Sequence, residues 1–144
     1  MVGVLTESEL VAWGVRLGSG LRPPAIITLT GDLGAGKTTL TQAICLGYGV
    51  RDEVTSPTFA IVHVYEARQS PVFHVDLYRL EGPRDLQNIG WDDMIRGDAI
   101  VIVEWPERAG SSVPRDAMSL ELRLEDGDPT RRQLLQHTPS GAAA

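Results

Sequence analysis

The residues best suited to chemistry form a short glycine-rich run, Gly31-Asp32-Leu33-Gly34-Ala35-Gly36-Lys37-Thr38. The run fits the phosphate-binding loop (P-loop) pattern, in which a glycine and four further residues precede Gly-Lys-Ser/Thr. Glycines let successive backbone N–H groups converge on phosphate oxygens, and the N-terminus of a following helix adds partial positive charge. The pattern therefore predicts a nucleotide phosphate site. A glycine-rich turn that merely caps a helix is the structural alternative.

The side chains at the end of this run have distinct predicted roles. Lys37 is the only lysine among 13 basic residues, and its compact ammonium can reach the β- and γ-phosphates. Thr38 is predicted to ligate Mg²⁺, and Thr39 to contact the α-phosphate. The predicted nucleotide site is completed by the loop residues Leu33, Gly34, Ala35 and Gly36.

Two carboxylates follow apolar runs and are candidates for the acidic group that a P-loop enzyme needs near its metal. Glu104 ends the most continuously apolar run of the chain, so we assign it to the metal shell. Asp76 ends Val72-Phe73-His74-Val75-Asp76 and is predicted to orient the attacking water or a metal-bound water. For each residue, a solvated acid at the end of a strand is the alternative interpretation.

The segments around the glycine-rich run supply the elements that a P-loop requires. Ala25–Thr30 is β-prone and predicts a buried strand before the loop. Thr38–Leu46 predicts a helix after it, which Gly47 and Gly49 are expected to stop. The predicted order is therefore strand, glycine-rich loop, helix.

An earlier helix is predicted from a capping signal. Thr6 and Glu9 have the Thr-x-x-Glu spacing of a capping box, and Leu10, Trp13 and Leu17 then recur at helical intervals. We expect this first helix to end near residues 18–20, where glycines occur.

The middle of the chain predicts a hairpin, a helix and a buried strand. Phe59–Glu66 and Val72–Leu80 are β-prone and separated by a short polar turn, which favours a hairpin. Pro83 begins a predicted amphipathic helix that reaches Met94. Ala99–Val103 is uniformly apolar, as in a strand that is covered on both faces.

The C-terminal part predicts two paired strands. Apolar and polar residues alternate from Met118 to Glu125, and Arg131–His137 can pair with this strand across a turn at residues 126–129. Residues 138–144 are small or polar and are expected to fray. The predicted fold is α/β: one P-loop NTPase domain over residues 1–144, with a central, mostly parallel sheet flanked by helices and a C-terminal antiparallel strand pair.

Composition narrows the function classes. The 144 residues are 42% hydrophobic and 22% charged, as expected for one soluble domain. A net charge of −6 argues against RNA held by a basic surface of this chain. The single cysteine, Cys45, makes no internal disulfide and is predicted to lie in the core. No membrane segment or secretory signal is recognisable, so we expect a cytoplasmic protein.

The same sequence favours ATP over GTP. A guanine-reading Asn/Thr-Lys-x-Asp motif is excluded, because the only lysine already stands in the glycine-rich run. The chain also lacks an insertion long enough to form the separate lid of a nucleoside monophosphate kinase.

Four motifs together resemble those of a known family. Besides the P-loop, they are Ser56-Pro57-Thr58-Phe59, His74-Val75-Asp76-Leu77-Tyr78-Arg79 and Glu104-Trp105-Pro106. Their order and spacing, from about Thr6 through Gly110, resemble the TsaE (YjeE) family. These small bacterial P-loop ATPases serve the formation of threonylcarbamoyladenosine (t6A) in tRNA, at the adenosine beside the anticodon.

The resemblance implies roles for individual residues. Gly34–Thr39 would hold ATP, with Thr38 and Glu104 serving Mg²⁺. Thr58 would act as part of a switch segment near the γ-phosphate, although a simple turn before a strand is an alternative, and Asp76 would assist hydrolysis.

Two further residues are placed near the site by the same resemblance. Glu7 would approach the nucleotide, although an ordinary acidic residue at a helix start explains it equally well. Trp105 would pack beside the site or face a partner, and an ordinary buried aromatic is the alternative.

The resemblance also implies a partner. In the family, ATP turnover is thought to reset the TsaB and TsaD assembly, which transfers the threonylcarbamoyl group, so tRNA would be reached only through that complex. No arginine finger is recognisable, which predicts slow hydrolysis by the isolated chain. A small-molecule kinase and a binding module that does not hydrolyse its nucleotide are the two rival functions.

Overall fold

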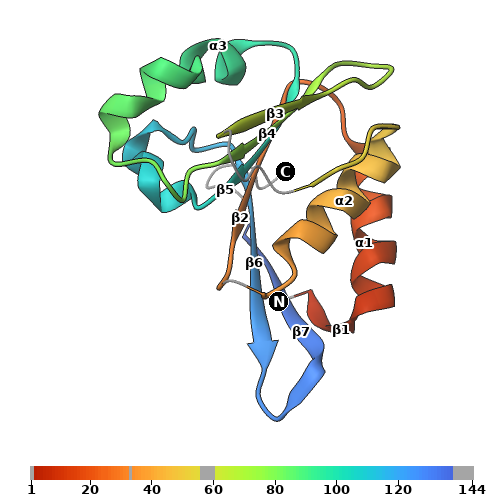
Figure 1. Cartoon of the computed structure of the whole chain (residues 1–144). Coiled ribbons are helices and arrows are strands. Elements are labelled where there is room, and N and C mark those ends of the chain that lie inside the picture. The colour runs from red at the N-terminus through yellow and green to blue at the C-terminus, as the bar shows by residue number, and fades with distance from the viewer. Residues whose placement is uncertain (1, 33, 56–60, 138–144) are drawn as a thin grey trace.

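A computed structural model describes residues 2–32, 34–55 and 61–137, in which seven strands form one sheet of order β1-β7-β6-β2-β5-β4-β3 (Figure 1). The strands are β1 (Gly3–Thr6), β2 (Ala25–Thr30), β3 (Val62–Tyr65), β4 (Val72–Asp76), β5 (Ile100–Glu104), β6 (Met118–Glu125) and β7 (Asp128–His137). The helices are α1 (Glu7–Gly20), α2 (Lys37–Tyr48) and α3 (Trp91–Arg96), with two 3₁₀ segments, η1 (Pro83–Ile89) and η2 (Pro106–Ser112).

The centre of the sheet is parallel. β2 pairs in parallel with β5 on one side and with β6 on the other, and β4 pairs in parallel with β5. β1, β7 and β3 are antiparallel to their neighbours. The predicted fold class is confirmed, including the antiparallel pair that β6 and β7 form. Because β2, β4 and β5 run in the same direction, their carboxyl ends meet at one edge of the sheet.

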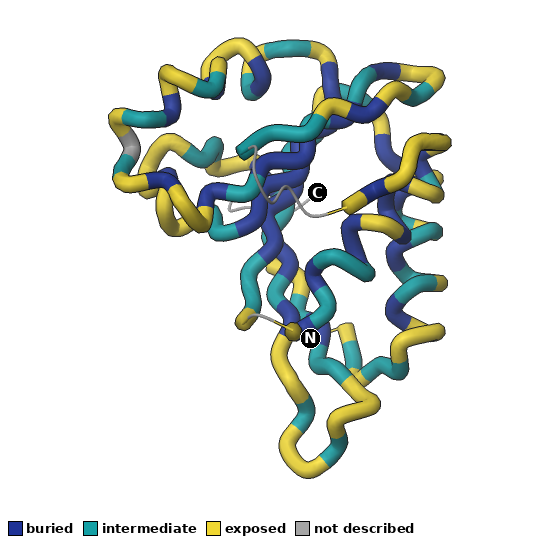
Figure 2. Tube along the Cα trace, viewed as in Figure 1, coloured by how far each residue is buried: buried dark blue, intermediate teal, exposed yellow. Residues whose placement is uncertain are grey.

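Two layers cover the sheet. α1 and α2 lie on one face, and η1, α3 and η2 lie on the other (Figure 1). Side chains of β5 alternate between these layers, with Ile100 and Ile102 in the cluster of α1 and α2, and Val101 and Val103 in the opposite cluster. Every residue of β5 is buried, as the apolar run predicts, and the centre of the sheet is dark blue in Figure 2.

The predicted capping box begins α1. The Glu9 N–H donates to Thr6 Oγ1 at 3.3 Å, and the Thr6 N–H donates to Glu9 Oε1 at 3.0 Å. These bonds satisfy two of the N–H groups that a helix start leaves unpaired. The helix ends at Gly20, within the predicted range.

Glycines allow α1 and α2 to pack very closely. A Cβ at Gly18 would lie 2.0 Å from the Ile44 carbonyl oxygen, and one at Gly47 would lie 2.1 Å from the Val15 carbonyl oxygen. Gly47 therefore lies inside α2, and the prediction that it stops the helix was wrong. The helix ends at Tyr48, and Gly49 follows it as the C-cap with a left-handed backbone (φ 101°).

The close contact between α1 and α2 predicts that alanine substitution at two glycines of α1 changes the free energy of unfolding by different amounts. Gly18→Ala should lower the free energy of unfolding by about 3 kcal/mol, because the added methyl meets a backbone carbonyl that cannot rotate away. Gly20→Ala is the matched control, since a Cβ there has no heavy atom within 4 Å, and we expect a change below about 1 kcal/mol. Urea denaturation measures both. Equal unfolding midpoints for the two variants would contradict the argument.

Several predicted boundaries are corrected. The strand predicted for Val72–Leu80 ends at Asp76, after which the chain turns with the Leu80 N–H donating to the Leu77 carbonyl. The helix predicted from Pro83 to Met94 is divided by Gly90, whose φ of 75° ends η1 before α3 begins.

Other segments differ from the prediction or were not anticipated. β1 pairs with β7 and was not predicted, because a strand of four residues is too short to show a clear alternation of apolar and polar residues. Phe59 and residues 138–144 lie outside the described residues.

Cys45 is buried, and the prediction that it is a core residue is confirmed. Burial raises the pKa of its thiol to about 12. Among the helices of the described part of the chain, we find none with the length and apolar character needed to cross a membrane.

Candidate nucleotide-binding site

The glycine-rich loop joins the carboxyl end of β2 to the N-terminus of α2, as predicted (Figure 1). Gly31 and Gly36 adopt φ angles of 151° and 105°, which side-chain-bearing residues rarely adopt. A Cβ at Gly31 would also lie 2.7 Å from the Leu122 carbonyl oxygen of β6. The loop conformation therefore depends on glycine at both ends. It leaves the first N–H groups of α2 at the end of the loop, where such groups commonly bind anions.

Lys37 is buried at the start of α2, with 6% of its surface exposed. Its ammonium donates a hydrogen bond to the Gly31 carbonyl and lies 4.0 Å from the centre of the Trp105 ring. Within residues 2–32, 34–55 and 61–137, no carboxylate forms an ion pair with Lys37. A buried ammonium without a directly paired carboxylate is costly, so this position favours an anionic ligand.

Trp105 packs beside the site. Its backbone is left-handed (φ 58°), which is unusual for a residue other than glycine and stores strain of roughly 1–3 kcal/mol. The ring contacts the ammonium of Lys37, and its centre lies 5.0 Å from the centre of the Tyr78 ring. Of the alternatives for Trp105, the packing against Lys37 supports a place at the site.

Glu104 and Asp76 end adjacent parallel strands and are register partners. Strand alternation puts Glu104 on the same face of the sheet as Ile100 and Ile102, and it puts Asp76 on the same face as Val72. Both carboxylates therefore lie on the face that α2 covers. The two carboxylates therefore lie near each other at the carboxyl edge of the sheet, where the loop from β2 begins.

The two carboxylates differ in environment. Glu104 is 3% exposed, so the interpretation as a solvated strand-end acid fails for it. Its Oε2 lies 2.6 Å from Nε2 of His74, which is fully buried. Asp76 is partly buried, and burial raises its pKa, although the Tyr78 N–H that donates to its Oδ1 at 3.0 Å acts in the opposite direction.

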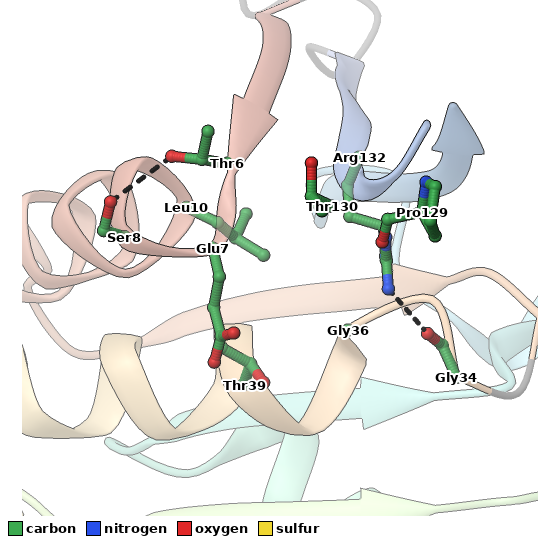
Figure 3. Close-up of a pocket in the computed structure, with 10 residues that line it drawn as sticks. All are labelled: Thr6, Glu7, Ser8, Leu10, Gly34, Gly36, Thr39, Pro129, Thr130 and Arg132. Atoms are coloured by element: carbon green, nitrogen blue, oxygen red, sulfur yellow. Dashed lines mark hydrogen bonds between the residues drawn. The ribbon is translucent and has the colours of Figure 1, made fainter. Parts of the chain in front are cut away.

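A pocket of about 610 Å³ opens beside the loop (Figure 3). Three parts of the chain form it, namely the start of α1, the loop with the first turn of α2, and the start of β7. Its lining residues are Thr6, Glu7, Ser8, Leu10, Gly34, Gly36, Thr39, Pro129, Thr130 and Arg132. Figure 3 shows the Glu7 side chain directed toward Thr39, so the structure brings the predicted residue Glu7 to the loop.

Arg132 holds the loop from outside and was not predicted from the sequence. Its Nη2 donates to the Gly34 carbonyl at 3.4 Å, as Figure 3 shows. Its Nε donates to the Ala35 carbonyl at 3.1 Å. Its Nη1 donates to the Pro129 carbonyl at 2.7 Å, which ties the guanidinium to its own strand. No local signal identifies this contact, because Arg132 lies 97 residues from Ala35 along the chain.

The Arg132 contacts predict an effect on nucleotide affinity. Arg132→Ala should weaken ATP binding by up to about 30-fold, because two hydrogen bonds that fix the loop are worth roughly 1 kcal/mol each. Arg131→Ala is the matched control, since Arg131 is exposed and pairs with Asp128 at 3.3 Å. Isothermal titration with ATP measures both. Wild-type affinity in Arg132→Ala would show that the loop keeps its shape without these bonds.

Comparison with known proteins adds to this geometry. The family profile described as "Threonylcarbamoyl adenosine biosynthesis protein TsaE" matches residues 4–134. The chain belongs to the TsaE family. The TsaE match continues past Gly110, where the resemblance of the motifs ended, and includes β6 and Arg132 of β7.

Individual TsaE proteins are similar over most of the chain. The tRNA threonylcarbamoyladenosine biosynthesis protein TsaE of Treponema pallidum is 37% identical, over 85% of this chain and 91% of its own length. The protein of that name from Streptomyces coelicolor is 40% identical, over 80% of this chain and 79% of its own. The crystal structure of Bacillus subtilis YdiB matches with a TM-score of 0.76 and 27% identity, over 97% of this chain and 89% of YdiB.

The remaining predicted site residues fall into two groups. Leu33 and Thr58 lie outside the described residues. Thr38 and Thr39 lie in the first turn of α2, directly after Lys37. In the part of the chain that the structure covers, no three or more His, Cys, Asp or Glu side chains form a group that could hold a metal ion.

Proposed function

We propose that the chain binds MgATP and hydrolyses it slowly by itself. The observation that carries this proposal is the buried ammonium of Lys37, which lies at a glycine-shaped helix N-terminus without an ion-pair partner among the described residues. A triphosphate would supply the missing negative charge, and the N–H groups at the start of α2 would bind its oxygens.

The residues around the loop fit the chemistry of a nucleotide with its metal ion. Thr38 and Glu104 would hold Mg²⁺ through hydroxyl and carboxylate oxygens, which are the ligands this ion prefers. When bound, Mg²⁺ neutralises charge on the phosphate oxygens. Asp76, at the neighbouring strand end, would orient the attacking water, and Thr58 would contact the γ-phosphate.

The pocket beside the loop suits the nucleoside end of the ligand. Its volume of about 610 Å³ falls within the roughly 300–1,000 Å³ of small-molecule sites. We assign the α-phosphate to Thr39 and the nucleoside to the space between Glu7 and Arg132. Leu33 to Gly36 would complete the phosphate site with backbone groups.

Family membership supports a role in t6A biosynthesis. We propose that ATP turnover drives the TsaB and TsaD threonylcarbamoyl-transfer complex in the cytoplasm, with no membrane involved. With a net charge of −6, the chain would leave tRNA binding to that complex.

Phosphate release tests this function. We expect slow release by the isolated chain with MgATP, and stimulation of about tenfold or more when TsaB and TsaD are added, because a partner can complete the catalytic site. Equal release with and without the partners would contradict the coupling. ATP that stays intact for hours under both conditions would instead support the non-hydrolysing binding module.

A further inference from the structure

Glu104 is the first member of a buried polar network that crosses three strands. Glu104 on β5 contacts His74 on β4 at 2.6 Å, and His74 Nδ1 lies 3.4 Å from the hydroxyl of Tyr65 on β3. All three residues are buried, at 3%, 0% and 4% exposure respectively. The network therefore runs from the candidate metal-binding acid into the core, away from the glycine-rich loop.

The hydrogen-bond capacity of the Tyr65 hydroxyl is filled. It donates to the Thr55 carbonyl at 3.0 Å, and its oxygen lies 3.4 Å from His74 Nδ1 and 3.3 Å from His63 Nδ1. A phenol has one proton to donate and can accept from both rings. Burial raises the pKa of Tyr65, which keeps that proton in place.

This arrangement restrains the His74 ring. Because Tyr65 uses its proton on Thr55, only His74 Nδ1 can be the donor in the contact with the Tyr65 oxygen. The 2.6 Å contact between His74 Nε2 and Oε2 of Glu104 then contains one further proton, shared by the ring and the carboxyl group. The His74 ring is held by Tyr65 at one nitrogen and contacts Glu104 at the other. The Glu104 carboxyl group therefore has little freedom to rotate. Such outer partners commonly fix the orientation of metal-binding side chains.

A purely structural role explains the network poorly. Buried polar groups across three strands are costly to desolvate, and well-packed apolar residues of similar volume often stabilise a protein as much or more. The neighbouring register pair, Val75 and Val103, is apolar and fully buried on the opposite face of the same two strands. Polar residues are therefore not required to join β4 to β5.

We propose that His74 and Tyr65 are positioning residues that orient the Glu104 carboxylate for its metal ion. This inference rests on the proposed function, because it assumes that Glu104 serves Mg²⁺. His74 does so through direct contact with Glu104, and Tyr65 acts one residue further away, through the ring of His74. Neither residue lines the pocket beside the loop.

The test measures metal affinity rather than turnover. Mn²⁺ is titrated into the full chain in the presence of ADP and followed by electron paramagnetic resonance, and ADP binding is measured separately in EDTA. Tyr65→Phe removes only the hydroxyl, His74→Ala removes the ring, and His74→Gln can place an amide nitrogen near the position of Nε2. Tyr48→Phe is the matched control, because it removes another buried tyrosine hydroxyl, which is 2.7 Å from Ser70 Oγ, at the far end of α2.

We expect Tyr65→Phe and His74→Ala to weaken Mn²⁺ binding about tenfold, and His74→Gln to stay within about threefold of wild type. ADP binding in EDTA should be unchanged in all variants, and Tyr48→Phe should match wild type throughout. If His74→Ala does not fold, as judged by circular dichroism, Tyr65→Phe carries the test alone.

Two results would overturn this inference and leave the proposed function intact. The first is wild-type Mn²⁺ affinity in Tyr65→Phe. The second is an equal loss of metal-free ADP binding, which would indicate general damage to the fold. A wild-type chain that binds neither ADP nor Mn²⁺ would overturn the proposed function and this inference together.

Discussion

Lys37→Ala is expected to weaken MgATP binding by at least about 100-fold, because removing one partner of a buried charge pair costs roughly 3–5 kcal/mol. Lys37 is buried, and its ammonium is held by the Gly31 carbonyl and the Trp105 ring. In the proposed complex the same ammonium contacts the β- and γ-phosphates, and no other lysine exists in the chain to replace it. Isothermal titration with MgATP measures the loss.

A second substitution separates the lost charge from lost packing. Lys37→Met also removes the charge, so it should also fail to bind ATP. Because methionine keeps an unbranched buried side chain, and because the lost charge has no ion-pair partner among the described residues, this variant should melt at or above the wild-type temperature. Thermal unfolding of both variants tests whether the fold survives. ATP hydrolysis at the wild-type rate by Lys37→Ala would refute the proposed ATPase.

Glu104→Gln is expected to lower the rate of ATP hydrolysis by at least about 100-fold, which corresponds to about 2.7 kcal/mol of transition-state stabilisation. The carboxylate is proposed to hold the metal ion whose charge matters most in the transition state, so ATP binding should weaken by no more than about tenfold. Glutamine is preferable to alanine because its side chain can still bond to His74, which contacts Glu104 at 2.6 Å.

The control for this substitution lies three residues further along the chain. Glu107→Gln removes the same charge from an exposed position in η2 and should hydrolyse ATP at the wild-type rate. Phosphate release at saturating MgATP gives the turnover of each variant, and titration gives its affinity. Undiminished turnover in Glu104→Gln would remove Glu104 from the proposed metal site.

Much of the region around the site could be predicted from sequence because its signals are local. The glycine-rich run with its lysine, the β-prone run before it and the helix after it occupy consecutive residues, and the structure confirms their order. The capping box of Thr6 and Glu9 spans four residues and is also confirmed. The uniformly apolar run before Glu104 predicted a buried strand, and β5 is buried throughout. The roles of Thr38, Thr58 and Asp76 stay predictions.

The sequence pattern is misleading where one helix meets another. Gly47 was expected to stop α2, but it lies inside that helix. Glycine is required there because α1 passes too close to leave room for a side chain. A glycine that ends a helix and one that admits a neighbouring helix look alike in sequence, since the deciding atom, here the Val15 carbonyl oxygen, belongs to a distant segment.

The sequence by itself determined the loop, its lysine and the two acidic strand ends, because hydrophobic runs and glycine spacing act over a few residues. Only the tertiary structure decided that Asp76 and Glu104 are register partners, that His74 holds Glu104, and that Arg132 of β7 bonds to the Ala35 carbonyl of the loop. These contacts depend on the order and register of strands far apart in the chain. No local pattern specifies that order, because it follows from how the whole sheet buries its two faces.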